Sequence, residues 1–506
     1  MEPHLAAPRT LLVIQCLMAA LVATTVSAAS AGAQGHAPYL PSQHWARVAL
    51  QRLAGAGGLD LAPANWAWPL RESEVRALFE SAGEKGHASG SRAAARYLVR
   101  FRREFGDPPA SPFSYVLDVG PFWTAQEGRL LGGRTYWVEG EGWNYPGPVA
   151  QAGEELWSER VSARIRIAGS AGAAFEMAGA GGGSRVRQAF ADVELGPVVL
   201  WGGRRSSALG PSTRGGLVLS GGIPLDGGGL ATRAGFRLPW LLDALGRVRI
   251  TSQLARMKES GTVSNPWFAS FRASLDVRPG LTLGLNRATI FGGSGNREDL
   301  TLRNVALMFI GITGQLGKSS GFENQVASLD LQTRFRLSNV PLRLDVEWGF
   351  DDIGGSWTNV PGLVVALEAP HVAQTGLSIA LEHVHISQSC CGNPEWYRHG
   401  GLGDGWTDRG RLLGHPLAGQ GSEWSLAADW DGSRGALGAR VFHRKRGEEN
   451  LFAPDWQGRA RGGELSTSAW IGRQIRASFR SVLEEGTGWR HWEMEAAVSL
   501  LWGGHW

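Results

Sequence analysis

The chain has 506 residues, and 50 Lys and Arg face 46 Asp and Glu, which leaves a formal net charge of +4. Hydrophobic residues make up 43%, and the only long apolar run lies at the N-terminus, so a polytopic helical membrane protein with several runs of about 20 apolar residues is excluded. The nearly balanced charge gives no case for a nucleic-acid partner.

The N-terminal segment predicts a secretory signal peptide. Arg9 precedes an apolar run over residues 11–26, and small-x-small cleavage motifs follow at 26–28 and 31–33. We therefore assign residues 1–28 to a signal peptide, with cleavage as late as residue 33 as a variant. A single membrane anchor is the alternative, but the run is short for a span and contains Gln15.

Residues 40–106 are predicted to form a small helical region. Ser42 can cap a first helix, Pro69 opens a second, and a third covers 91–105 before Gly106 ends it. The third helix carries arginines largely opposite its apolar stripe. We interpret this basic face as a solvated helix face, and binding to anionic lipid head groups or an acidic polymer is the alternative; its arginines are Arg92, Arg96, Arg100 and Arg103.

From residue 112 onward, strand-length segments alternate apolar and polar residues, with Gly-rich or polar turns between them. In 326–337, one face carries Leu329 and Phe335 while the other carries Asp330 and Arg336. Alternation with period two predicts β-strands whose two faces meet different environments. The same pattern occurs over 267–277, 281–286, 342–350 and 424–431.

The polar faces carry full charges of both signs, as the wet lumen of a large outer-membrane barrel does. The strands of a soluble β-sandwich would show the same alternation of apolar and polar residues equally well. Tryptophans near the segment ends favour the membrane, because they suit aromatic girdles; these are Trp348, Trp424, Trp430, Trp470, Trp492 and Trp502. We therefore predict an all-β fold, a transmembrane antiparallel outer-membrane β-barrel of about 16–18 strands over residues 112–506.

The C-terminus supports the barrel. From Trp492 to Trp506 every second residue is apolar, aromatic or small, and the chain stops on an aromatic ring inside the pattern. Closing strands of outer-membrane barrels have one lipid-facing side and an aromatic at the membrane interface. The terminal segment is therefore predicted to be the final strand of the barrel.

Metal and catalytic motifs are weak. Cys390 and Cys391 are adjacent, and with His383 and His385 they lack any standard zinc spacing. No nucleophile elbow, phosphate loop or zinc-protease motif occurs. Acidic pairs such as 351–352 point to opposite strand faces and make no glycosidase dyad by themselves. We expect no catalytic residue and no metal site.

The segment 389–416 is the richest in chemistry, because aromatic rings and arginines are interleaved along it. Aromatic faces can stack on sugar rings, and arginine can bind uronate carboxylates through two hydrogen bonds. The segment is thus a candidate polysaccharide-binding surface, and a packed loop or a lumen constriction is the alternative. The candidate glycan-binding residues are Trp396, Tyr397, Arg398, Trp406, Arg409 and Arg411.

At these residues the chain resembles the Wzi family of capsule assembly proteins. The segment from Asp408 to Leu417, with Gly414-His415-Pro416, is similar to the glycine–histidine–proline segment of the family. Further similar segments, in the same order, are 40–42, 69–75, 202–220, 324–352 and 444–447. The family turn often carries tryptophans before Gly-Pro, and here Ser206-Ser207-Ala208 stands in that place.

The resemblance implies an outer-membrane barrel of about 18 strands with residues 40–106 as a helical domain on the periplasmic side. It implies a lectin-like, non-enzymatic role in organising capsular or exported polysaccharide at the cell surface, without a cofactor. Polysaccharide and outer-membrane lipid are then the expected partners of a monomer. A diffusion porin or uptake channel is the alternative function, and a secreted glycan hydrolase is a third.

The strand count also predicts on which side of the membrane residues 389–421 lie. If the C-terminus is periplasmic, the last hairpin turns outside the cell. Counting back through strands near 434–446 and 422–431 then puts 389–421 on the periplasmic side, unless a strand pair is hidden within it. A surface role for Trp396 or Trp406 depends on that count.

Overall fold

A computed structural model describes the chain from residue 39 to residue 505, with gaps. The predicted signal peptide lies outside the described residues. The segments left out within that range are 41–43, 60–69, 86–87, 106–113, 128–154, 167–170, 181–182, 213–214, 221–222, 233–234, 238–244, 261–262, 296–322, 339, 352–361, 373–374, 388–395, 399–404, 409–410, 449, 453–455 and 473.

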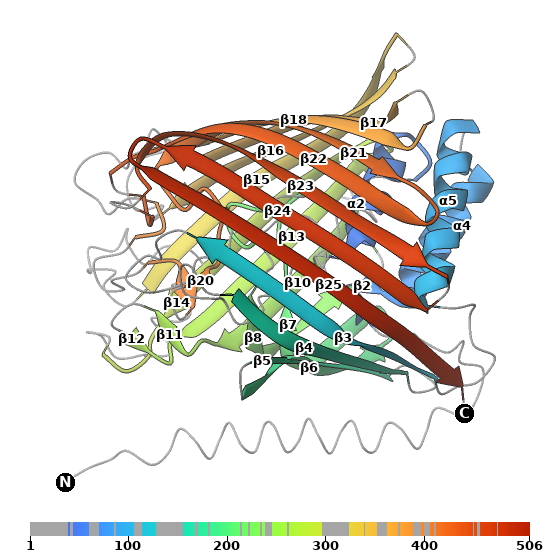
Figure 1. The fold of residues 1–506 in the computed structure, drawn as a ribbon, viewed down its shortest axis with the longest axis horizontal. Coiled ribbons are helices and arrows are strands. Elements are labelled where there is room, and N and C mark those ends of the chain that lie inside the picture. The colour runs from blue at the N-terminus through green and yellow to red at the C-terminus, as the bar shows by residue number, and fades with distance from the viewer. Residues whose placement is uncertain are drawn as a thin grey trace.

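Antiparallel strands form a closed barrel, and three helices lie against one of its ends (Figure 1). Each barrel strand pairs with the next along the chain, and the last strand pairs with the first, for example Ala496 with Trp123. The short β9 continues β8, since both pair with β10, so 18 strand positions make up the ring that the structure describes. The predicted fold class is confirmed.

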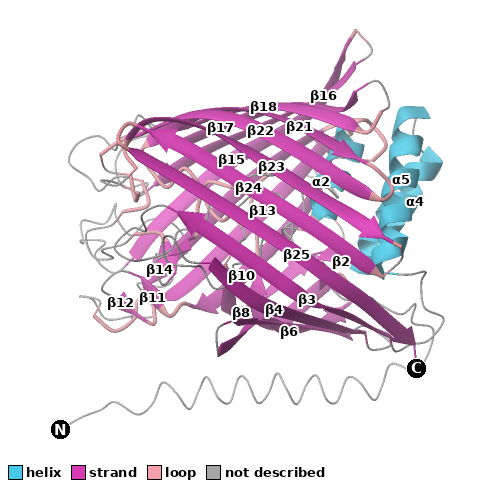
Figure 2. Cartoon of the chain, in the orientation of Figure 1, coloured by secondary structure: helices cyan, strands magenta, loops and turns pink. Residues whose placement is uncertain are grey.

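The barrel strands are β3 (Ser114–Glu127), β4 (Glu155–Arg166), β5 (Ala171–Ala180), β6 (Gly183–Leu195), β7 (Val198–Ser206), β8 (Pro224–Thr232), β9 (Phe236–Arg237), β10 (Arg247–Arg256), β13 (Trp267–Arg278), β14 (Leu281–Phe291), β15 (Glu323–Leu337), β16 (Val340–Asp351), β17 (Gly362–Val372), β18 (Leu377–Ile386), β21 (Gly421–Asp431), β22 (Gly435–Arg446), β23 (Gly458–Ile471), β24 (Ile475–Gly486) and β25 (Trp489–His505). Three small pairs lie outside the ring (Figure 2): β1 (Tyr39–Leu40) with β2 (Leu70–Arg71), β11 (Glu259–Ser260) with β12 (Val263–Ser264), and β19 (Thr407–Asp408) with β20 (Arg411–Leu412).

The barrel is apolar outside and polar inside, as the alternation predicts. On β15, Leu329 is 43% exposed, whereas its neighbour Asp330 is 4% exposed. The outward residues of β21 and β22 include Trp424, Leu426 and Val441, all exposed. Inward arginines and carboxylates pair with one another across neighbouring strands and across strands one further apart, so the buried charges have ion-pair partners.

The predicted aromatic girdles are partly confirmed. Trp348 and Trp424 lie on the outer face near one end of the barrel, and Trp430 lies on the outer face near the other end. Trp470 does not belong to a girdle, because its ring is buried and lies near the Arg476 guanidinium. The prediction was wrong there because proximity to a strand end does not fix which face a residue occupies.

The helices are α2 (Trp45–Gly55), α4 (Glu72–Lys85) and α5 (Ala88–Phe105). They share an apolar core of their own, in which Phe79, Tyr97 and Phe101 are fully buried. The N-cap of α2 is His44, whose Nδ1 accepts from the Ala46 N–H, and not Ser42 as the sequence suggested. Among the described helices, none is long and apolar enough to cross a membrane.

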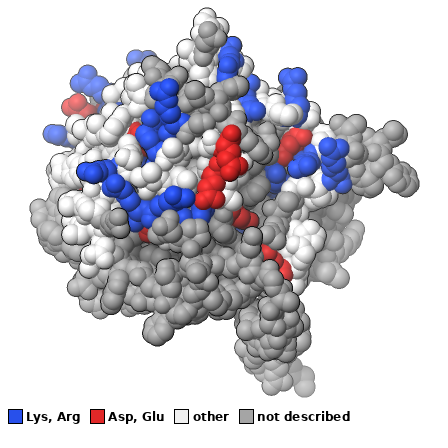
Figure 3. Space-filling model, turned by 90° about the vertical axis from the view of Figure 1, so that its right-hand side faces the viewer, with Lys and Arg blue, Asp and Glu red and all other residues white. Residues whose placement is uncertain are grey.

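We call the barrel end that meets these helices the helical rim, and the opposite end the loop rim. Figure 3 looks onto the helical rim, where basic and acidic side chains lie side by side. On α5, Arg92 is exposed, but Arg100 is buried, where its guanidinium binds Asp431 and lies 4.1 Å from the Trp45 ring centroid. The arginines of α5 therefore divide between solvent and the barrel and do not form one solvated face.

The loop between β18 and β21 emerges at the loop rim. Gly376, just before β18, accepts from the N–H of Asp431, the residue that Arg52 of α2 binds at the helical rim, so β18 ends at Ile386 on the far side. The count that put 389–421 beside the C-terminus was wrong because it omitted β23 (Gly458–Ile471), whose Gly462-Gly463 pair weakens the alternation. Trp396 and Trp406 thus belong to the rim opposite the C-terminus.

Candidate functional site

A column of loop residues runs through the lumen. The segment 207–220, between β7 and β8, folds inward and closes as a hairpin, since Leu209 N–H donates to the Leu219 carbonyl at 3.0 Å. Leu217 and Val218 are fully buried in its apolar core. The Leu217 N–H lies 3.2 Å from both carboxylate oxygens of Glu347, an inward residue of β16. We call the described residues within 207–220 and 396–418 the inner column.

The two parts of the column are joined by aromatic hydrogen bonds. Tyr397 donates through Oη to the Leu217 carbonyl at 2.5 Å, and the same Oη accepts from the His415 N–H at 2.9 Å. Trp406 donates through Nε1 to the Val218 carbonyl at 2.9 Å. These aromatic side chains are therefore fixed by polar contacts as well as by packing.

Burial sets the protonation of this segment. Burial raises the pKa of Tyr397 well above its usual value, so its hydroxyl stays a donor at neutral pH. Burial lowers the pKa of His415 to about 4. Its neutral Nδ1 accepts from the Leu417 N–H at 3.1 Å, which leaves the proton on Nε2.

Glycine permits the tight fold of 396–418. Gly405 has a φ of +70°, and a Cβ at this position would lie 1.5 Å from the Tyr397 carbonyl oxygen. That carbonyl accepts from the Trp406 N–H at 2.6 Å. Any side chain at 405 would separate the two strands of this turn.

At the helical rim, α2 holds the other end of the column. Arg47 Nη2 lies 3.3 and 3.2 Å from the carbonyls of Gly210 and Ser212, and Gln51 Nε2 donates to the Pro211 carbonyl at 3.0 Å. The column therefore contacts both the helices and the loop-rim segment. One short piece of chain connects the two ends of the barrel through its interior.

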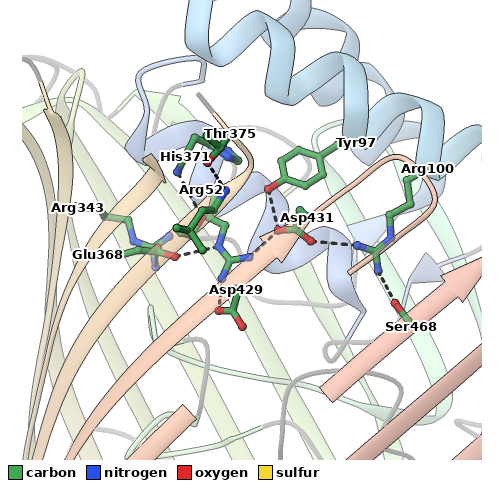
Figure 4. A network of polar contacts seen from close by, with 12 residues as sticks. Arg52, Tyr97, Arg100, Arg343, Glu368, His371, Thr375, Asp429, Asp431 and Ser468 are labelled. Carbon is green, nitrogen blue, oxygen red and sulfur yellow. Dashed lines mark hydrogen bonds and ion pairs between the residues drawn. The ribbon is translucent and has the colours of Figure 1, made fainter. Parts of the chain in front are cut away.

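Next to this contact, a cluster of charges fixes α2 and α5 to the wall (Figure 4). Arg52 binds Glu368, Asp429 and Asp431 at 2.9, 2.5 and 2.7 Å. Asp431 also accepts from Tyr97 Oη at 3.1 Å. The surrounding carboxylates keep the pKa of Arg52 well above its usual value despite burial, so the cluster is ionised.

An aromatic group that the sequence reading missed lies on the inner side of the loop rim. Phe452 and Trp456 stack at 5.0 Å between centroids, and Trp456 stacks on the half-buried Trp489 at 5.9 Å. The Arg446 guanidinium lies 5.8 Å from the Trp489 ring centroid and binds Glu484 at 2.7 Å. The sequence signal that could have identified this group is the position of Trp489 on β25, which faces the barrel interior.

The structure places the predicted glycan-binding residues unevenly. Trp396, Tyr397 and Trp406 are 3%, 0% and 0% exposed, so in this conformation their faces are covered and not open to a sugar. Arg398 is half-buried beside the Asn450 carbonyl. Arg411 contributes its backbone to β20, and Arg409 lies outside the described residues. Sugar contacts by the three arginines stay a prediction.

Cys390 and Cys391 of the predicted non-metal segment lie outside the described residues. In the part of the chain that is described, no group of three His, Cys, Asp or Glu could hold an ion. His383 instead stacks on Trp424 at 4.1 Å, and both lie on the outer face of the barrel.

The asparagine Asn450 clamps the loops of the loop rim together. Its Nδ2 donates to the carbonyls of Leu417 and Gln420 at 2.7 and 3.0 Å, and its Oδ1 accepts from the Phe452 N–H at 2.9 Å. The column and the aromatic group are therefore parts of one packed assembly.

Comparisons with known proteins agree with this architecture. The model of a family described as "Capsule assembly protein Wzi" matches residues 140–496. Among solved structures, the chain is similar to Escherichia coli Wzi, described as an outer-membrane protein involved in group 1 capsule assembly and as a carbohydrate-binding β-barrel. The identity is 16%, the TM-score is 0.69, and 92% of this chain and 99% of that chain are covered.

Two Pseudomonas aeruginosa proteins also match, at lower similarity. OpdL is 13% identical over 77% of this chain and 99% of its own, with a TM-score of 0.45. OccK5 (OpdH) is 11% identical over 78% and 98%, with a TM-score of 0.46. A comparison with curated protein sequences gives no match.

Proposed function

Because this chain belongs to the Wzi family of capsule assembly proteins, we propose that it binds capsular or exported polysaccharide at the cell surface without acting as an enzyme. The fold is that of an outer-membrane barrel, and the E. coli relative is described as binding carbohydrate. Our proposal transfers that property to this chain.

The proposal includes an orientation. The C-terminus and the helices of residues 40–106 lie on the periplasmic side, and the loop rim faces outward. Export follows from the signal peptide predicted over residues 1–28. In this orientation the outward-facing rim carries the packed loops, and the helical rim meets the periplasm.

The observation that carries the proposal is the inner column. A diffusion channel needs a free passage, whereas here α2, residues 207–220 and residues 396–418 pack against one another along the lumen. Loops that are fixed in advance by buried hydrogen bonds lose little conformational entropy when they bind a ligand. The arrangement therefore favours a rigid binding surface over a channel.

We propose that sugar contacts lie where the rim is both aromatic and partly open. Trp489 is half-buried, is supported from beneath by Trp456 and lies beside Arg446. A tryptophan with one supported face offers a large, rigid surface for a sugar ring. Arg398, with Arg409 and Arg411 as predicted from the sequence, is suited to acidic groups of the polymer.

A deletion strain tests the function. We expect loss of surface-retained polysaccharide, restored by the full chain and restored poorly by Trp489→Ala. The matched control is Trp424→Ala, a lipid-facing tryptophan at the same rim, which should restore retention fully. Unchanged polysaccharide retention in the deletion strain would overturn the proposal.

Planar bilayers separate this role from the channel alternative. The purified barrel should show no stable single-channel conductance, because its column occupies the lumen. Open channels with a conductance typical of porins, measured on the unmodified chain, would favour the uptake function instead.

A further inference from the structure

Four cations form a patch on the outer, lipid-facing side of β22–β25, close to the loop rim. We call Lys445, Arg459, Arg461 and Arg490 the basic outer patch. Strand register brings them together: Lys445 lies opposite Arg459, while Arg461 and Arg490 both lie opposite Glu485. With a strand spacing of about 4.8 Å, the patch spans roughly 14 Å around the barrel.

The patch is poorly neutralised by the protein itself. All four side chains are exposed, and only Arg461 has a carboxylate partner within the described residues, Glu485 at 3.5 Å, with the two side chains 81% and 59% exposed. Like charges placed directly opposite each other, as at 445 and 459, destabilise a strand pair. Among the described residues of the adjoining loop, Glu448 is a further exposed acid, so the described cations outnumber the described exposed acids.

The height of the patch relative to the membrane is set by the residues beneath it. On each of these four strands, the outward-facing residues change from charged to apolar within at most three outward-facing positions from the patch. The apolar residues are Val441, Leu465, Leu483 and Met494, and all are exposed. Trp492 lies between Met494 and Arg490 on the outer face of β25. Cations directly beyond an apolar band lie where the polar head groups of the lipids begin.

The outward charge is densest in this sector, and β10 and β14 each carry a single outward arginine near the same rim, Arg256 and Arg287. At the corresponding outward positions, β16, β17 and β18 carry Phe350, Leu363 and His385. A purely solvated rim would need no such concentration of charge.

We propose that the basic outer patch binds the phosphate groups of an anionic glycolipid in the outer leaflet of the membrane. Arginine binds phosphate through paired N–H donors, and lysine adds a compact charge. The occupant is a lipid and not a soluble anion, because the cations project from the lipid-facing side, where acyl chains can cover the apolar band beneath. The site is separate from the proposed polysaccharide surface, which faces inward.

Native mass spectrometry of the full chain in detergent tests this site. The probes are bis-phosphorylated lipid A, its dephosphorylated form and inorganic phosphate. The variant is Lys445→Gln/Arg459→Gln, and the matched control is Arg278→Gln/Arg336→Gln, two exposed arginines at the helical rim. Heat-modifiable migration on gels reports that each barrel is folded.

We expect the unmodified chain to prefer the phosphorylated lipid, and the patch variant to lose about five-fold in affinity for each cation removed. The control variant should bind as the unmodified chain does. Equal binding of both lipids, unchanged binding by a folded patch variant, or full competition by inorganic phosphate at equal concentration would each overturn the proposal.

Discussion

Arg52 and Asp431 lie 379 residues apart in the chain, yet their side chains meet at 2.7 Å between Nη1 and Oδ2. The contact joins the first described helix to the end of β21. Arg52 also binds Glu368 and Asp429, so one guanidinium pairs with three carboxylates. Arg343 and Arg100 add positive charge at Glu368 and Asp431. Arg52 is therefore one of the buried side chains that fix the helices at the rim, together with Arg100.

Arg52→Ala should strongly destabilise the docking of the helices. Removing the guanidinium takes one ion-pair partner from each of three carboxylates, and breaking a buried pair typically costs about 3–5 kcal/mol. Arg343 still binds Glu368 and Arg100 still binds Asp431 in this variant. Limited proteolysis should release fragments ending near residue 105 from the variant but not from the unmodified chain. Arg92→Ala, on the exposed side of α5, is the control and should behave normally. Equal resistance of the two variants would contradict this account.

Tyr397→Phe should loosen the inner column. The substitution removes the partner of both the Leu217 carbonyl and the His415 N–H, each buried, at a cost of about 1–3 kcal/mol. Hydrogen exchange measured by mass spectrometry should become faster in peptides covering 405–418. Trp424→Phe, which changes a ring on the outer face, should leave exchange there unaltered. Exchange that is equally slow in Tyr397→Phe would show that packing alone holds the column.

Acid should open the same segment through His415. Its pKa is about 4 in the fold, below the roughly 6.5 of an unfolded chain, so the open form takes up a proton first as pH falls. The contribution of His415 to the stability of the closed segment is therefore fully present above about pH 6.5. It falls by up to ~3 kcal/mol as the pH is lowered to about 4. Glu423, Arg440 and Arg444 also act on this ring and partly offset one another.

The pH effect can be measured by hydrogen exchange at 405–418 between pH 7.5 and 4.5, after correction for intrinsic rates. His415→Gln does not titrate in this range and should show a flatter profile. An identical pH profile for the two proteins would assign the acid sensitivity to another group.

Val441→Arg should destabilise the barrel in a bilayer. Val441 is 60% exposed at the middle of β22, so the new charge would meet hydrocarbon, at a cost of about 2–4 kcal/mol. Leu437→Arg lies near the end of the same strand, where arginine reaches the interface and the cost falls to about 0–1 kcal/mol. Denaturant titration in vesicles checks both; equal losses would mean that this face does not contact lipid.

The sequence was sufficient to predict the barrel because the signal is local. Leu329 and Asp330 are neighbours whose exposures differ tenfold, and only a strand between two solvents produces that contrast repeatedly. The expected number of strands came from the length of the chain after the helical region, and the alternation located individual strands. It failed at Gly458–Ile471, where glycines and small polar residues replace the outward apolar set.

The inner column could not be predicted, because it depends on contacts between residues far apart in the chain. Tyr397 and Leu217 are separated by 180 residues, and nothing near Tyr397 in the sequence distinguishes a buried ring from an exposed one. Interleaved Trp and Arg suggested a sugar-binding face, whereas a wide lumen can bury whole loops against its wall. Trp489 was overlooked because its stacking partner Trp456 lies before β23, far from Trp489 in the chain.

The pairing of β3 with β25 has a consequence for biogenesis. The seam of the ring joins residues near 120 to residues near 500, so the cylinder cannot close until the last residues have been delivered. A chain truncated before β25 would leave the edges of β3 and β24 unpaired and open to other chains. Assembly of this protein is therefore expected to be post-translational, with quality control acting on complete polypeptides.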